Sequence, residues 1–117
     1  MLVEVRVREG VCIVEGMESI ARVDDALDLV AACIERASTR LLLESRHLPT
    51  AFFDLRSRFA GEFLQKLQNY RIRVAGVSPS EHGYNERFRE FLLEAKQGRS
   101  FRAFAVRSEA ESWLASE

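Results

Sequence analysis

The beginning of the chain alternates apolar and charged residues with the period of a β-strand. Residues 2–8 set three valines between glutamate and arginine residues, which predicts a strand with one buried face. A second run rich in β-branched residues, 11–14, lies between Gly10 and Gly16. Because glycine takes a positive φ without steric cost, we expect a tight antiparallel hairpin with its turn at Gly10.

Farther along the chain, the apolar residues recur at helical spacing. This spacing predicts one helix over about residues 25–38, with Asp24 and Asp25 at its capped first turn, and a second over about residues 57–70. Gly61 falls inside the second helix, where glycine costs up to about 1 kcal/mol relative to alanine. We therefore expect another backbone to approach the helix closely at Gly61.

The last third of the chain predicts two more helices. An apolar stripe that includes Phe88 forms the third helix, which Gly98 ends from a C′ position. Residues 108–111 have the pattern of a capping box, which predicts a short closing helix. Short apolar runs between the helices predict the remaining strands: residues 40–44, 72–77 and 101–106.

The order of these elements defines the expected fold class. The order β-β-α-β-α-β-α-β-α predicts a single compact α/β domain over residues 1–117, with no repeat or linker dividing the chain. Alternating strands and helices require right-handed crossovers and a mainly parallel sheet. The N-terminal hairpin adds antiparallel pairing at one side of that sheet.

Composition narrows the classes of protein to consider. Of the 117 residues, 47% are hydrophobic, 17 are basic and 18 are acidic, which gives a net charge of -1. No apolar run approaches the length of a membrane span, the start lacks a secretory signal pattern, and the charge gives no general attraction to nucleic acid. We expect a cytoplasmic protein without membrane or nucleic-acid partners. Cys12 and Cys33 fit small buried hydrophobes in a reducing compartment better than a disulfide or metal site.

The sequence offers little catalytic chemistry. Neither of the glycine-rich phosphate-binding patterns is present, so we expect no nucleotide cofactor of those types. His47 and His82 lie singly in different loops, which argues against zinc. Ser45 lies near His47 after a predicted strand, but no nucleophile elbow surrounds the serine. We expect no catalytic residue, no metal and no cofactor.

Residues 52–62 carry an unusual local arrangement of charge. Arg56 and Arg58 come at the start of a predicted helix, whose positive end repels them by a few tenths to about 1 kcal/mol. The compensating anion is external in one interpretation: a phosphate, a carboxylate or an acidic partner that binds the arginines and the free N–H groups.

The compensation is internal in the other interpretation. Asp54 caps the helix, while Arg58, Glu62 and Lys66 pair with one another at successive i,i+4 spacings, each contact contributing about 0.3–0.5 kcal/mol. The sequence alone leaves both interpretations open.

For the neighbouring aromatic and basic residues, a structural role is favoured over a binding role. Of Phe52 and Phe53, we expect one to pack into the core and the other beneath the following helix, with a partner anchor as the alternative. Arg71 and Arg73 fall on one face of a strand, where a solvated or salt-bridged role is favoured over contact with nucleic acid.

Several segments together carry a resemblance to a known family. They are Asp-Ala-Leu-Asp-Leu at 25–29, Phe-Phe-Asp-Leu at 52–55, Ala-Gly-Glu at 60–62, Leu-Gln-Lys at 64–66, and Asn-Tyr-Arg-Ile-Arg-Val-Ala at 69–75. Over about residues 11–114, the chain resembles the bacterial domain-of-unknown-function family numbered forty-one eighty. The loop after Val77 departs from it, with Ser-Pro-Ser-Glu where glycine or acidic residues are common. The resemblance implies no particular activity.

The element order is also similar to that of STAS-type domains, the sulfate-transporter and anti-sigma-antagonist group. In those regulatory modules a serine before the second long helix can be phosphorylated, which alters partner binding. Ser57 has a similar position here, although the Asp-Ser-Ser-Gly type of motif is missing. The similarity is an analogy at the level of the fold.

Two main hypotheses for function follow. The first is a non-enzymatic regulatory or protein-interaction module that uses residues 52–62 and the second helix, with a protein partner or a second copy of the chain. The alternative is a domain that binds a small molecule or anion, either as an enzyme or as a binding protein, with its site at Asp54, Arg56, Arg58 and Glu62, extended by Glu44 and Lys66. A structural homo-oligomer, with an apolar patch on the hairpin or the last helix, is a third hypothesis.

Overall fold

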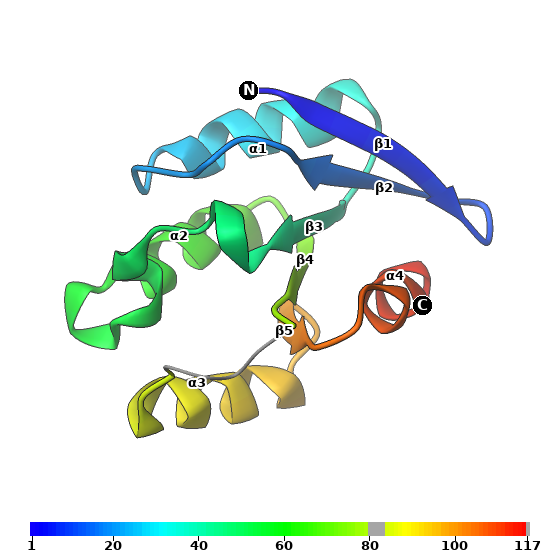
Figure 1. Ribbon diagram of the computed structural model, residues 1–117. Coiled ribbons are helices and arrows are strands. Elements are labelled where there is room, and N and C mark those ends of the chain that lie inside the picture. The colour runs from blue at the N-terminus through cyan, green and yellow to red at the C-terminus, as the bar shows by residue number, and fades with distance from the viewer. Residues whose placement is uncertain (80–83, 117) are drawn as a thin grey trace.

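The computed structural model describes residues 1–79 and 84–116 of the chain (Figure 1). In this part the strands are β1 (Val3–Arg8), β2 (Val11–Gly16), β3 (Arg40–Glu44), β4 (Arg73–Val77) and β5 (Phe101–Phe104). The helices are α1 (Asp25–Glu35), α2 (Phe59–Gln68), α3 (Glu86–Gln97) and α4 (Arg107–Ala115). Three short 3-10 turns follow β3: Ser45–His47, Thr50–Phe53 and Leu55–Ser57. The predicted order of elements is confirmed.

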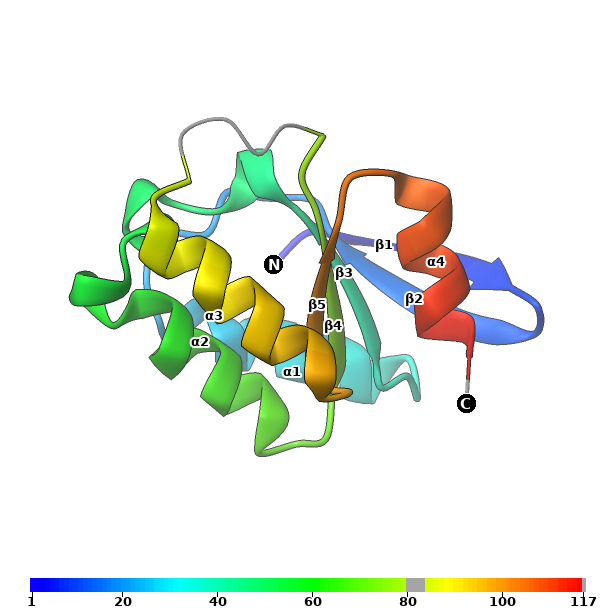
Figure 2. The same cartoon turned by 90° about the horizontal axis from the view of Figure 1, so that it is seen from below.

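The strands are arranged in the sheet in the same order as in the chain. β1 pairs antiparallel with β2, and β2, β3, β4 and β5 then pair in parallel. Right-handed crossovers between strands added in one direction place every connecting helix on the same face. Figure 2 shows this result, with α1, α2 and α3 on one side of the sheet and α4 on the other. The fold is the α/β domain that the sequence predicts.

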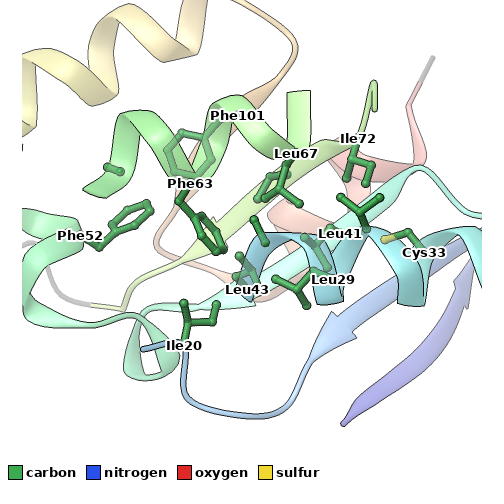
Figure 3. Packing of buried hydrophobic residues seen from close by; sticks show 14 of the residues in the cluster. Ile20, Leu29, Cys33, Leu41, Leu43, Phe52, Phe63, Leu67, Ile72 and Phe101 are labelled. Atoms are coloured by element: carbon green, nitrogen blue, oxygen red, sulfur yellow. The ribbon is translucent and has the colours of Figure 1, made fainter. Parts of the chain in front are cut away.

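The face of the sheet under α1, α2 and α3 holds the larger part of the core (Figure 3). The register aligns Leu41 with Val74, and Val74 with Phe101, so one apolar row crosses the parallel strands. Phe63 and Leu67 of α2 are completely buried above this row. The apolar stripe of α2 thus fixes the helix, and the turn before it, to the sheet.

On the other face, α4 packs through Ala110 and Leu114, both fully buried. The predicted capping box is wrong, because α4 begins at Arg107 and the N-cap residue Val106 makes no side-chain cap hydrogen bond. Starting the helix earlier places Arg107 in its first turn.

The expectation for the first strand is also wrong in one respect. β1 forms as predicted, and Gly10 has the expected positive φ of 80°. However, Val5 and Val7 are 47% and 72% exposed. β1 is an edge strand, so these two side chains lie at the border of the sheet and remain open to solvent.

Backbone conformation moves two predicted helix ends and differs from the prediction at a third, where the helix ends as expected. α1 stops at Glu35 because Ala37 takes a left-handed conformation, and α2 starts at Phe59 because Arg58 does so, with φ values of 50° and 65°. Gly98 caps α3 with φ of -95°, so it does not act as the left-handed C′ glycine that the sequence suggests.

No backbone lies close to Gly61, contrary to the sequence-based expectation. A Cβ built on Gly61 meets nothing within 4 Å outside its own helix backbone. Gly61→Ala should therefore raise the free energy of unfolding by about 0.5–1 kcal/mol in urea denaturation, because alanine loses less backbone entropy in a helix. Gly16→Ala is the contrasting control: its Cβ would lie 2.9 Å from Leu43 Cδ2, so it should destabilise the protein. A loss of stability in Gly61→Ala would contradict this prediction.

Candidate functional site

The segment of residues 52–62 is an exposed turn built on a buried aromatic ring. Phe52 is only 2% exposed, and its ring meets the rings of Phe59 and Phe63 edge-on at centroid distances of 6.4 and 6.3 Å. Phe52 therefore packs in the core, as one alternative predicted. Phe53 instead stacks on Tyr84 at 5.6 Å, so it lies beside the start of α3 rather than beneath α2.

Ser57 caps α2. Its Oγ accepts a hydrogen bond from the Phe59 amide at 3.1 Å and lies 2.5 Å from the Ala51 carbonyl oxygen and 2.7 Å from that of Asp54. The single hydroxyl proton serves one of these carbonyls at a time. Ser57 is nevertheless an exposed residue, so the hydroxyl lies at the surface.

Asp54 does not cap α2, and that prediction is wrong. Its carboxylate accepts from the Arg56 amide at 3.1 Å, which caps the Leu55–Ser57 turn, and lies 3.4 Å from Arg56 Nε. The Arg56 side chain remains 83% exposed, so this ion pair contributes little energy. Its charge stays available at the surface.

The expected ladder of ion pairs along α2 is wrong as well. Within residues 1–79 and 84–116, no ion pair joins Arg58 to Glu62 or Glu62 to Lys66. Lys66 instead reaches α1, where its Nζ lies 3.6 Å from Asp24 Oδ1. Arg58 and Glu62 are exposed, and the left-handed conformation of Arg58 costs about 1 kcal/mol or more for a residue with a Cβ.

The structure separates Glu44 from the other predicted site residues. Glu44 ends β3 and lies on the face of the sheet that α4 covers, where it accepts from Arg107 at 2.9 Å. Asp54, Arg56 and Arg58 lie on the turn before α2. The structure therefore does not gather Glu44 with them around a common centre.

A second cluster of charge, which the sequence reasoning missed, surrounds Glu15. The Glu15 side chain is 1% exposed, and Arg107 donates to both of its carboxylate oxygens. Arg6 Nε donates to Glu15 from the other side at 3.1 Å, and Arg107 also binds Glu44 and Glu111. Each carboxylate in this cluster is bound by an arginine.

The electrostatics of Glu15 follow from these contacts. Burial raises the pKa of its carboxyl, but the hydrogen bonds and positive charges of Arg107 and Arg6 outweigh burial and hold the pKa below its usual value. Glu15 therefore acts as a charged structural anchor between the sheet and α4, since a proton acceptor for catalysis needs a pKa raised toward the working pH.

Most of the chain matches a known protein family. Residues 8–114 match the model of the family described as Domain of unknown function (DUF4180). The chain belongs to this family. The match confirms the resemblance carried by the segments of α1, α2 and β4. No curated protein matches the DUF4180 chain.

The remaining candidate groups of this DUF4180 domain show no convergence. In the part of the chain that the structure describes, no three His, Cys, Asp or Glu side chains could hold a metal ion together, and no helix is long and apolar enough to cross a membrane. Within the described residues, Ser45 and His47 share one 3-10 turn but no hydrogen bond joins their side chains, and His82 lies outside those residues.

Both cysteines of the DUF4180 domain are free thiols. Burial, together with the neighbouring Cys12, raises the pKa of the Cys33 thiol to about 11. Cys33 therefore stays protonated at neutral pH and behaves as a small apolar residue, since the thiolate is the reactive form.

Proposed function

We propose that this DUF4180 domain is a non-enzymatic regulatory or protein-interaction module of the cytoplasm, whose partner meets residues 52–62 and the exposed face of α2. One observation carries the proposal: the exposed Ser57 hydroxyl lies between two exposed arginines on a turn that a buried aromatic ring holds in place. Such a turn presents its charges without a large loss of entropy on binding.

The chemistry of this surface favours an acidic partner. Arg56 is paired only weakly with Asp54, and Arg58 has no ion pair in the described part of the chain. Both lie near the N-terminus of α2, where the helix dipole also favours negative charge. An Asp- or Glu-rich segment of another protein supplies the carboxylates that guanidinium groups bind best.

Phosphorylation of Ser57 is the regulation that fits this site. A phosphate on Oγ would add about -1.5 to -2 charges between Arg56 and Arg58 and remove the proton that Oγ donates to a carbonyl. The added charge would neutralise the arginines and repel an acidic partner. The similar element order of STAS-type modules supports this step by analogy only.

The test compares two double variants as baits for partner capture with quantitative mass spectrometry. Arg56→Ala with Arg58→Ala should reduce recovery of specific partners by about tenfold, which corresponds to the loss of one or two charge-assisted contacts. Arg22→Ala with Arg87→Ala removes the same charge from exposed positions elsewhere and should leave recovery unchanged. Circular dichroism checks that both variants are folded. Identical partner profiles for the two variants would overturn the proposed surface.

A further inference from the structure

Arginines converge at the amino-terminal end of the sheet, away from the turn before α2. Arg40 and Arg73 are the first residues of β3 and β4 and are direct neighbours across the two strands. Arg71 and Arg99 come from the segments that lead into β4 and β5. These four residues line a groove of about 360 Å³.

Two of the guanidinium groups are held in place by the end of α4. Arg40 Nε donates to the Leu114 carbonyl at 2.7 Å, and Arg73 Nη1 donates to the Trp113 and Ser116 carbonyls at 3.0 and 2.8 Å. These acceptors are main-chain oxygens without a full negative charge. The contacts therefore orient the two arginines without neutralising them.

The groove differs in this respect from the cluster around Glu15. There, Arg107 is matched by carboxylates, whereas Arg40, Arg71 and Arg73 form no ion pair with any residue in the described ranges. Burial and the positive charges of Arg40, Arg99 and Arg102 lower the pKa of Arg73. The groove is thus a place where positive charges repel one another, and a bound anion would relieve that repulsion.

Arg71 occupies a position where glycine is the usual residue. The Arg71 amide bonds to Gln68 O at 2.8 Å and the Ile72 amide to Leu67 O at 3.2 Å, which together form a Schellman cap at the end of α2. Arg71 is the C′ residue of this cap, with φ of 58°. Its exposed side chain makes no hydrogen bond or ion pair within the described part of the chain. The unfavourable conformation thus places an unpartnered guanidinium at the rim of the groove.

We propose that this arginine groove binds a small molecule through a phosphate group. Guanidinium groups bind phosphate oxygens in pairs, and several of them at one site favour a dianion over a single carboxylate. Gln68 and Ser100 also line the groove and add neutral polar groups for the rest of a phosphate ester. The groove lies at the opposite end of α2 from residues 52–62, so it neither requires nor excludes the proposed partner surface.

The limited volume of the groove, about 360 Å³, favours a small ligand over nucleic acid. Nucleic-acid binding depends on many phosphate contacts spread along a basic face. The whole chain has a net charge of -1. A local cluster of arginines around one cavity matches a single phosphate or diphosphate better than a long polyanion.

The test titrates the intact chain with inorganic phosphate, pyrophosphate and glycerol phosphate at constant ionic strength, with chloride as the reference anion. Calorimetry and thermal unfolding should show saturable binding of at least one phosphate compound, and NMR should show shifts of arginine Nε–H signals. Arg71→Gln should weaken binding by about tenfold, the loss expected for one charge-assisted contact. Arg87→Gln, on the exposed face of α3, is the control of equal charge and should bind as the wild type does.

A second variant separates the side chain from the backbone. Arg71→Gly should raise Tm without ligand, because glycine favours the left-handed conformation, and should still lose phosphate affinity. The proposal is overturned if phosphate compounds act no differently from chloride, or if Arg87→Gln loses as much affinity as Arg71→Gln. A single-stranded oligonucleotide that binds more tightly than pyrophosphate, dependent on Arg71, would overturn the assignment to a small molecule.

Discussion

Arg107→Gln should lower the free energy of unfolding by about 3 kcal/mol at pH 7. The variant leaves the buried Glu15 carboxylate with Arg6 as its remaining arginine, and loss of one partner from a buried pair costs about 3–5 kcal/mol. The lower end applies because the Arg107 side chain is 31% exposed. Urea denaturation measures the change, and Arg22→Gln, at an exposed position, should differ from the wild type by less than about 0.5 kcal/mol.

The pH dependence of this effect identifies Glu15 as its cause. Because the pKa of Glu15 is lower in the folded protein than in the unfolded chain, its ionisation stabilises the fold. This contribution is fully present at pH values above the unfolded-state pKa of about 4.3 and is lost as the pH falls through the folded-state pKa. In Arg107→Gln, only Arg6 remains to oppose the rise in the Glu15 pKa that burial causes, so the ionised carboxylate stabilises the fold less. The difference between wild type and variant should therefore be largest at neutral pH and shrink below about pH 4.

A second substitution provides the control for Glu15. Adding Glu15→Gln to Arg107→Gln removes the poorly compensated charge and should recover part of the lost stability at pH 7. An Arg107→Gln effect that is the same at pH 7 and pH 4, with no recovery on adding Glu15→Gln, would contradict the assigned role of the pair.

Phe52→Ala should lower the free energy of unfolding by about 3–5 kcal/mol, the range for truncating a buried aromatic residue to alanine. Its ring lies 6.0 Å from that of Phe88 and 6.4 Å from that of Phe101, in addition to the two aromatic rings of α2. Few small movements can fill the resulting cavity, because the neighbours come from α2, α3 and β5. Urea denaturation monitored by circular dichroism measures the loss.

Phe53→Ala is the matched control for that prediction. The same side chain is removed one residue along, but Phe53 is only half-buried and leaves less apolar surface unpaired. Its cost should be smaller than that of Phe52→Ala. Equal losses for the two variants would mean that Phe52 is not the fixed base of the exposed turn.

Much of the fold is predictable because periodicity and connection lengths are local properties. The alternation of strands and helices is visible in the sequence, and the handedness of crossovers then determines which face the helices cover. Exposure of Val7 is not predictable in this way, since it depends on the place of β1 at the edge of the assembled sheet. Helix caps are also not predictable from the local sequence. Ser57 and Asp54 are both of the residue types that cap helices, and the course of the turn decides which amide each side chain binds.

The sites of charge are harder to predict for a different reason. Arg107 and Glu15 are 92 residues apart in the chain, and the sequence around each residue does not indicate that the two form a pair. Arg71 and Arg73 are visible as a basic pair, but the register that places Arg40 beside Arg73 is a property of the sheet. A polar residue inside an apolar strand, such as Glu15 after Val14, is the one sequence signal that points to a buried partner.

The order of strands in the sheet has a consequence for synthesis on the ribosome. Each parallel strand pairs with the strand made just before it, so the sheet can grow by one strand at a time as the chain emerges. α4 is made after all five strands and covers the face of the sheet opposite the other helices (Figure 2). Until Arg107 leaves the ribosome, Glu15 lacks its main counterion, and the growing sheet stays open on that face. α4 then covers that face and brings Arg107 to Glu15, so the pairing of this buried charge depends on a segment made after the whole sheet.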